Sequence, residues 1–129
     1  MRISEEQYRQ FLGKKALKYH NNKVVKNGIK YDSQKEYLRH LYLKTLEEEG
    51  KISELELQKK FLLQEEFIHE GKKERPIYYI VDFYYFDKKL NCYIAEDVKS
   101  EITRQDKTYR LKRKIFIHEF PWVVFKEVL

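Results

Sequence analysis

The residues with the clearest capacity for chemistry are two acids and one lysine in neighbouring strand-like segments. Asp82 lies in an apolar run, and Asp97 and Lys99 belong to a second run at 93–99. Because side chains alternate faces along a strand, Asp97 and Lys99 point the same way. A polar turn at 87–89 would fold the runs into a hairpin, so the two carboxylates would form an oxygen site for Mg²⁺ or Mn²⁺. With a lysine beside it to face a phosphate, such a site predicts metal-assisted phosphodiester hydrolysis.

Two alternatives stay open, one to the metal site as a whole and one to the identity of its second ligand. A buried Asp–Lys ion pair would show the same spacing, although ionised carboxylates in apolar surroundings need a partner or a metal. Glu96 is an alternative ligand beside Asp97. Alternation places Glu96 on the opposite face and favours Asp97, whereas a β-bulge would reverse that choice.

The elements that must position these residues follow from periodicity and turn signals. Ser33-x-x-Glu36 is a capping box, and it predicts a helix that ends near Gly50. Asn27-Gly28 predicts the turn of a hairpin at 24–31. A short helix is expected at 4–18, and a basic helix at 106–119 with Leu111 and Ile115 facing inward. The remaining expectations are one or two strands within 52–63, strands at 77–86, 90–99 and 122–125, and loops at 69–76 and 100–105.

This order of elements predicts an α/β protein, in which helices flank a mixed sheet built from antiparallel hairpins and one helical crossover. The 129 residues suggest a single domain. Within it, residues 1–32 form a basic extension with a helix and a hairpin, and residues 33–128 form the core.

Charge and composition point to an anionic partner inside a cell. The net charge is +6, and residues 1–32 carry eight basic against three acidic side chains. Nucleic acid is the expected partner of such a chain. The single cysteine, Cys92, suggests a reducing compartment, and no apolar run is long enough to span a membrane. We therefore expect a cytoplasmic protein.

Basic side chains near both ends of the chain could follow a phosphate backbone. A solvated helix face, or a polar tail at the N-terminus, would look the same. The candidates are Lys14, Lys15, Lys18, Lys23, Lys107, Arg110, Lys112, Arg113 and Lys114. No Gly-rich phosphate loop is present, so no nucleotide cofactor is expected.

Several stretches together resemble the PD-(D/E)xK nuclease superfamily. They are Gly28 to Glu36, Leu55 to Gln58, Asp82-Phe83, Glu96 to Lys99 and Tyr109 to Lys114. The chain looks most like a family of small phage-encoded proteins of unknown function that are thought to act like Holliday-junction resolvases. The superfamily pattern has a proline before the first acid, whereas this chain has Val81.

The resemblance implies a restriction-endonuclease-like αβββαβ core over about 33–128 and a Mg²⁺-dependent endonuclease that acts on branched DNA as a homodimer. Asp82 and Asp97 would bind the metal, together with the Val98 carbonyl. Glu36 would hold a metal or its water, although as a capping residue it already has a structural role. Lys99 would position the attacking water. A DNA-binding protein of the same fold without activity, and a packaging or restriction-type nuclease, are the alternatives.

Overall fold

The computed structural model of the chain describes residues 2–13 and 23–128. The chain divides into two compact units, Met1–Leu55 and Glu56–Leu129. The predicted mixture of helices with a mixed sheet is confirmed. The helices are α1 (Glu5–Leu12), α2 (Gln34–Glu48), α3 (Glu101–Arg104) and α4 (Lys107–Glu119), and the strands are β1 (Val24–Lys26), β2 (Ile29–Tyr31), β3 (Ile52–Gln64), β4 (Phe67–His69), β5 (Lys72–Glu74), β6 (Ile77–Asp87), β7 (Cys92–Val98) and β8 (Val123–Val128).

The first unit contains two helices, the β1–β2 hairpin and the start of β3. Helix α1 packs on α2 through a small core that includes Ile3, Tyr8 and Leu38. The hairpin turns at Asn27 and Gly28, which both have positive φ angles as the sequence predicts. The part of the expected helix 4–18 that lies within 2–13 is confirmed over Glu5–Leu12, and the rest lies outside the described residues.

Helix α2 begins where the sequence predicts. The Ser33 hydroxyl accepts a hydrogen bond from the Glu36 backbone amide at 3.2 Å, which is the N-cap contact. The Glu36 carboxylate accepts from the Asp32 amide at 3.2 Å, one residue before the N-cap. Gly50 follows the helix with a φ of +78°, a conformation that glycine adopts without strain.

The second unit is built on a four-stranded sheet in the order β3-β6-β7-β8. Strands β6 and β7 are antiparallel, whereas β7 and β8 are parallel. The crossover between β7 and β8 contains α3 and α4, and α3 occupies part of the segment 100–105, where the sequence predicted only a loop. This order confirms the predicted mixed sheet with one helical crossover.

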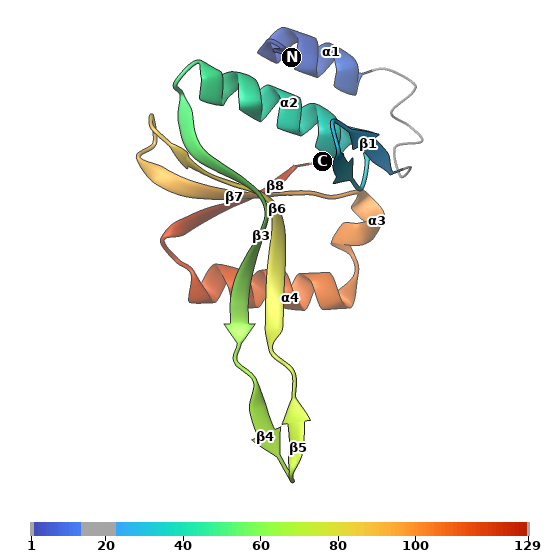
Figure 1. Ribbon diagram of the computed structural model, residues 1–129, viewed down its shortest axis with the longest axis vertical. Coiled ribbons are helices and arrows are strands. Elements are labelled where there is room, and N and C mark those ends of the chain that lie inside the picture. Colours follow the sequence, from blue (N-terminus) through green and yellow to red (C-terminus); the bar gives the residue numbers. More distant parts are fainter. Residues whose placement is uncertain (1, 14–22, 129) are drawn as a thin grey trace. The chain divides into compact units, whose positions relative to one another are not determined.

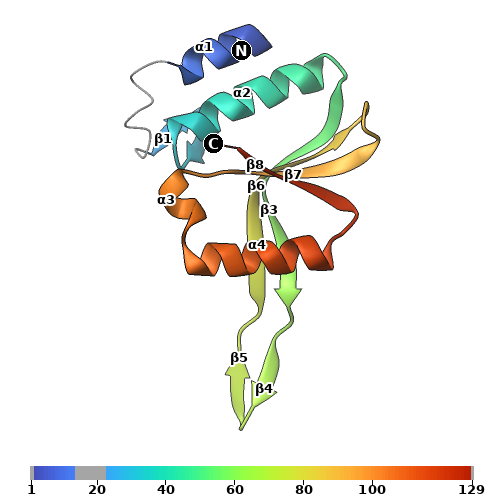
Figure 2. The ribbon, with the colours of Figure 1, turned by 180° about the vertical axis from the view of Figure 1, so that it is seen from behind.

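Helix α4 lies along one face of this sheet (Figure 2). Its buried side chains are Tyr109 and Phe116, which join Phe61, Tyr79 and Val81 in the core of the unit. The prediction that Leu111 faces inward is wrong, because its side chain is 60% exposed. Tyr109 and Phe116 are seven residues apart and share a helix face, from which Leu111 points away.

The prediction of a loop at 69–76 is also wrong. Strands β4 and β5 pair as an antiparallel hairpin that continues beyond β3 and β6 (Figure 1). Glu70 and Gly71 form its turn, and both have positive φ angles. The polar composition of the segment concealed these strands, since neither of them buries a face.

Candidate functional site

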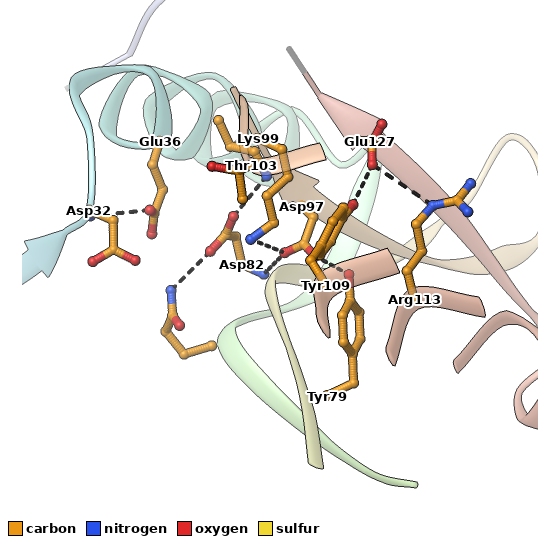
Figure 3. Close-up of polar contacts among 12 residues, drawn as sticks. Asp32, Glu36, Tyr79, Asp82, Asp97, Lys99, Thr103, Tyr109, Arg113 and Glu127 are labelled. Atoms are coloured by element: carbon orange, nitrogen blue, oxygen red, sulfur yellow. Dashed lines mark hydrogen bonds and ion pairs between the residues drawn. The ribbon is translucent and has the colours of Figure 1, made fainter. Parts of the chain in front are cut away.

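The two acids singled out in the sequence meet where β6 and β7 stop pairing. The antiparallel register ends at Phe83 and Glu96, so Asp82 and Asp97 are the next residues on the two strands. The Asp82 backbone amide donates to Asp97 Oδ1 at 3.3 Å, and the Val98 amide donates to Asp82 Oδ2 at 2.7 Å (Figure 3). Each carboxylate is therefore held by the backbone of the opposite strand.

Asp97 is completely buried, and its carboxylate has three polar neighbours. The Tyr79 hydroxyl donates to Oδ2, the Lys99 ammonium lies 3.9 Å from Oδ1, and the Asp82 amide reaches the same Oδ1. Burial raises the pKa of the Asp97 carboxyl to about 7, while the Lys99 charge opposes this shift and the Asp82 charge adds to it. Two carboxylates held this close together, with Asp97 fully buried, are a place where an added cation would be favoured.

Lys99 lies where the sequence predicts, on the same side of β7 as Asp97. Its ammonium is 5.1 Å from the centroid of the Tyr109 ring on α4, which fixes the side chain between the strand and the helix. The side chain is 22% exposed, so its charge is near the surface. A phosphate that approached the two acids would meet this ammonium.

The register decides which of the two neighbouring acids, Asp97 or Glu96, lies beside Asp82. Glu96 is completely buried, and the Tyr85 hydroxyl donates to its carboxylate. Glu96 and Asp97 are consecutive strand residues, so they face opposite sides of the sheet. The structure brings Asp97 next to Asp82, as alternation predicts.

Gln58 is a contact of Asp82 to which the sequence analysis gave no role. Its side-chain amide Nε2 donates to Asp82 Oδ1 at 3.3 Å. Gln58 has a φ of 52° within β3, which is a local break in regular strand geometry. The stretch 55–58 was part of the family resemblance, but nothing in its spacing indicates a contact with the acids.

The other predicted residues have different surroundings. Glu36 belongs to the first unit, and its role beside the two acids stays a prediction. The Val98 amide contacts Asp82, and a role for its carbonyl is likewise a prediction. Lys23 is exposed, and Lys14, Lys15 and Lys18 lie outside the described residues. Along α4, Lys107, Arg110 and Lys114 are exposed, and Lys112 and Arg113 are half-buried.

The oxygen donors at this site fit a hard divalent cation that keeps much of its water. Within residues 2–13 and 23–128, no three His, Cys, Asp or Glu side chains are grouped so that they could hold a metal. In the second unit, the Asp82 and Asp97 carboxylates are the candidate oxygen ligands that lie next to each other. Mg²⁺ is commonly held by one or two carboxylates with several retained waters, so the donor set suits Mg²⁺ or Mn²⁺.

Comparisons with known proteins place the sequence in a family. The model of the family described as "Protein of unknown function (DUF1064)" matches residues 16–128. Searches of curated proteins and of solved structures found no match. In the described part of the chain, no helix is long and apolar enough to cross a membrane.

Proposed function

The chain belongs to the DUF1064 family, and we propose that it is a divalent-metal-dependent DNA endonuclease. The observation that carries this proposal is the cross-strand linkage of Asp82 and Asp97, with the Lys99 ammonium 3.9 Å from Asp97. Two carboxylates beside one lysine are what metal-assisted phosphodiester hydrolysis requires.

Each residue of the site would have a distinct role in the proposed reaction. Asp82 and Asp97 would hold Mg²⁺ or Mn²⁺, which when bound supplies a water of lowered pKa and positive charge for the phosphate. The Tyr79 hydroxyl and the Val98 amide orient the two carboxylates before substrate arrives. Lys99 would contact the scissile phosphate and stabilise the charge that grows on it during in-line attack.

The finer parts of the proposal rest on the resemblance to PD-(D/E)xK nucleases. It implies a restriction-endonuclease-like core, and the order α2, β3, β6, β7, α4, β8 is compatible with the αβββαβ sequence of elements. It also implies hydrolysis that leaves a 5′-phosphate and a 3′-hydroxyl, a branched DNA substrate and a homodimer. We further propose that the protein acts inside a bacterial cell, on host or phage DNA.

A cleavage assay tests this function directly. A labelled four-way junction, a linear duplex and a single strand would each be incubated with the full chain in Mg²⁺, Mn²⁺ or EDTA. Asp82→Asn and Lys99→Ala proteins would run in parallel, with Glu96→Gln as the control for loss of a buried carboxylate on the opposite face. We expect metal-dependent cutting that both site variants lose and the control keeps.

The alternatives give different results in the same assay. Salt-sensitive binding without cutting, unchanged by Asp82→Asn, would replace the enzyme with a DNA-binding protein. Equal cutting of junction and linear duplex would keep the enzyme but remove the preference for branched DNA. Cutting by the Asp82→Asn and Lys99→Ala proteins at the wild-type rate would reject the proposed site.

A further inference from the structure

A second group of charged side chains lies between α3, α4 and β8. A cavity of about 540 Å³ is lined by Glu101, Arg104, Gln105, Arg110, Arg113 and Glu127, and we refer to it as the arginine cavity. Three of its six lining residues are arginines, whose guanidinium groups bind phosphate oxygens in a forked geometry.

Of the two carboxylates in the lining, Glu101 and Glu127, it is Glu127 that is paired with arginines of the cavity. Arg104 Nε lies 2.5 Å from one of its oxygens, and Arg113 Nε lies 3.8 Å from the other (Figure 3 shows the Arg113 contact). The Glu127 side chain is 16% exposed, whereas those of Arg104 and Arg113 are 44% and 41% exposed. The arginines are therefore accessible from solvent although they are paired with an inner carboxylate.

Positive charge exceeds negative charge around the cavity. In the part of the chain that the structure describes, Arg110 has no ion pair with a carboxylate. Arg110 and Arg113 also line an adjoining cavity of about 530 Å³, together with Lys107, Leu111 and Lys114. The two cavities share Arg110 and Arg113 and form one basic surface with room for an anion.

Glu127 also connects the arginine cavity to the candidate active site. In the parallel register of β7 and β8, Glu127 is the partner of Asp97, so the two side chains face the same side of the sheet. The Tyr109 hydroxyl donates to Glu127, and the Tyr79 hydroxyl donates to Asp97. The rings of Tyr79 and Tyr109 are 6.4 Å apart and fill the space between the two carboxylates.

We propose that the arginine cavity binds a backbone phosphate of the nucleic acid next to the scissile one, and that Glu127 occupies Arg104 and Arg113 until this phosphate arrives. The inference deepens the proposed function and rests on it for the nature of the substrate. The cavity is lined by Glu127, the register partner of Asp97 on the adjacent strand, and this neighbourhood suits a flanking phosphate. The Tyr109 hydroxyl donates to Glu127 Oε2, so the carboxylate keeps one donor when the two arginines turn to the phosphate.

The direct test is the affinity of the full chain for a labelled DNA duplex and a four-way junction, measured by fluorescence anisotropy in EDTA and in Ca²⁺. Arg110→Ala removes a side chain without an ion pair, so the protein should stay folded. We expect binding to weaken at least about 5-fold and the slope of log K against log salt to become shallower by about 0.9, the value of one phosphate contact. Arg110→Lys, which keeps the charge but loses the fork, should fall between Ala and wild type.

The matched control is Lys88→Ala, which removes an exposed positive charge from the β6–β7 turn. It should change affinity by less than about 2-fold, since charge removal alone acts weakly at a distance. Equal weakening by Arg110→Ala and Lys88→Ala would overturn the assignment of the cavity, because only total charge would then matter.

Glu127→Gln tests the second half of the proposal. The amide oxygen can still accept the Tyr109 hydroxyl, but the negative charge that holds Arg104 and Arg113 is gone. We expect DNA affinity to rise at least about 3-fold, since the arginines no longer have to leave a carboxylate. Unchanged or weaker binding by a protein with the wild-type melting temperature would overturn the competition between Glu127 and phosphate.

The two proposals can fail separately. Binding is measured without catalysis, so an effect of Arg110→Ala with no cleavage of any substrate would retain the cavity and reject the nuclease. Metal-dependent cleavage with no effect of Arg110→Ala on affinity would retain the nuclease and reject the cavity. Wild-type protein that binds no DNA in either EDTA or Ca²⁺ would overturn the cavity proposal.

Discussion

The Asp82 carboxylate accepts a 2.7 Å hydrogen bond from the backbone amide of Val98, the residue between Asp97 and Lys99. The Asp82 amide in turn donates to Asp97 at 3.3 Å. These side-chain bonds stand where a regular sheet would continue its backbone ladder. The two acids are thus part of the junction between β6 and β7, and their separation is fixed by the backbone of both strands.

This linkage predicts the behaviour of Asp82→Asn. The Asn carbonyl can still accept the Val98 amide, so the protein should fold, but one metal-binding charge is lost. We expect the wild-type melting temperature to rise with added Mn²⁺ or Mg²⁺, as binding to the native state requires, and the variant to show no such rise. Differential scanning fluorimetry over a metal titration measures this. An equal rise in both proteins would exclude Asp82 as a ligand.

Tyr79→Phe should alter the metal requirement of the reaction. The change removes the hydroxyl that orients Asp97, so a higher Mg²⁺ concentration should be needed for half-maximal cleavage. The free energy of unfolding should fall by about 1–3 kcal/mol, because a buried carboxylate oxygen loses a donor. Cleavage rate against Mg²⁺ concentration and urea unfolding are the two measurements.

Tyr85→Phe is the matched control for that experiment. It removes the corresponding hydroxyl from Glu96, the buried acid on the opposite face. A similar loss of stability is expected, with the Mg²⁺ requirement unchanged. If both variants shift the requirement equally, Tyr79 acts only through general stability.

At Gln58, two substitutions can separate the effect of the side-chain contact from the effect of the backbone conformation. Gln58→Ala and Gln58→Gly both remove the amide that contacts Asp82 Oδ1, so both should lower the cleavage rate, by roughly 10-fold for one lost positioning contact. The Gly variant should be about 1 kcal/mol more stable than the Ala variant, because a φ of 52° strains any residue with a Cβ and Gly relieves that strain. Comparing the cleavage rates and urea midpoints of the two proteins checks this. Rates that follow stability instead would argue against a positioning role.

His40 predicts a pH dependence of stability within the first unit. Its Nδ1 lies 2.5 Å from the Tyr31 hydroxyl, and burial, with a smaller contribution from Lys44, lowers its pKa from 6.5 to about 4. Between pH 6.5 and about 4, the unfolded chain takes up a proton at His40 that the folded chain does not. The stabilisation is therefore complete above pH 6.5 and is lost as pH falls through about 4.

His40→Asn should remove this dependence, because the side chain no longer titrates. The difference in free energy of unfolding between wild type and variant should change by at most about 3 kcal/mol between pH 7 and pH 4, at about 1.4 kcal/mol per pKa unit. Urea unfolding at several pH values gives the difference. A constant difference across this range would mean that His40 does not titrate as its surroundings indicate.

The acids and the lysine could be predicted from sequence because Asp82 and Asp97 lie in strands with clear turn signals and Lys99 directly follows the second strand. Asn27-Gly28, the Ser33 cap and the polar turn at 87–89 defined the hairpins and the helix, and alternation then placed Asp97 and Lys99 on one face. These are local signals, which depend on residues a few positions apart. Asp82 and Asp97 are brought together by a single antiparallel hairpin, so few residues separate them in the sequence.

The residues that the sequence analysis did not assign to the site are placed there by contacts between distant parts of the chain. Glu127 lies beside Asp97 only because β8 pairs in parallel with β7 in one particular register, and no turn connects those strands. Gln58 reaches Asp82 through a positive φ angle inside a strand, which its residue type does not signal. In the sequence, Tyr79 looks like an ordinary aromatic residue of the core, and only the structure shows that its hydroxyl donates to Asp97.

Helix α4 carries two kinds of residue with different physical surroundings. Tyr109 and Phe116 are buried against the sheet, whereas Lys107, Arg110 and Lys114 are exposed. Substitutions at the exposed positions change the charge offered to a polyanion without changing the packing of the core. The charge on this surface can therefore be changed one residue at a time while the fold stability and the geometry of the acids stay as they are.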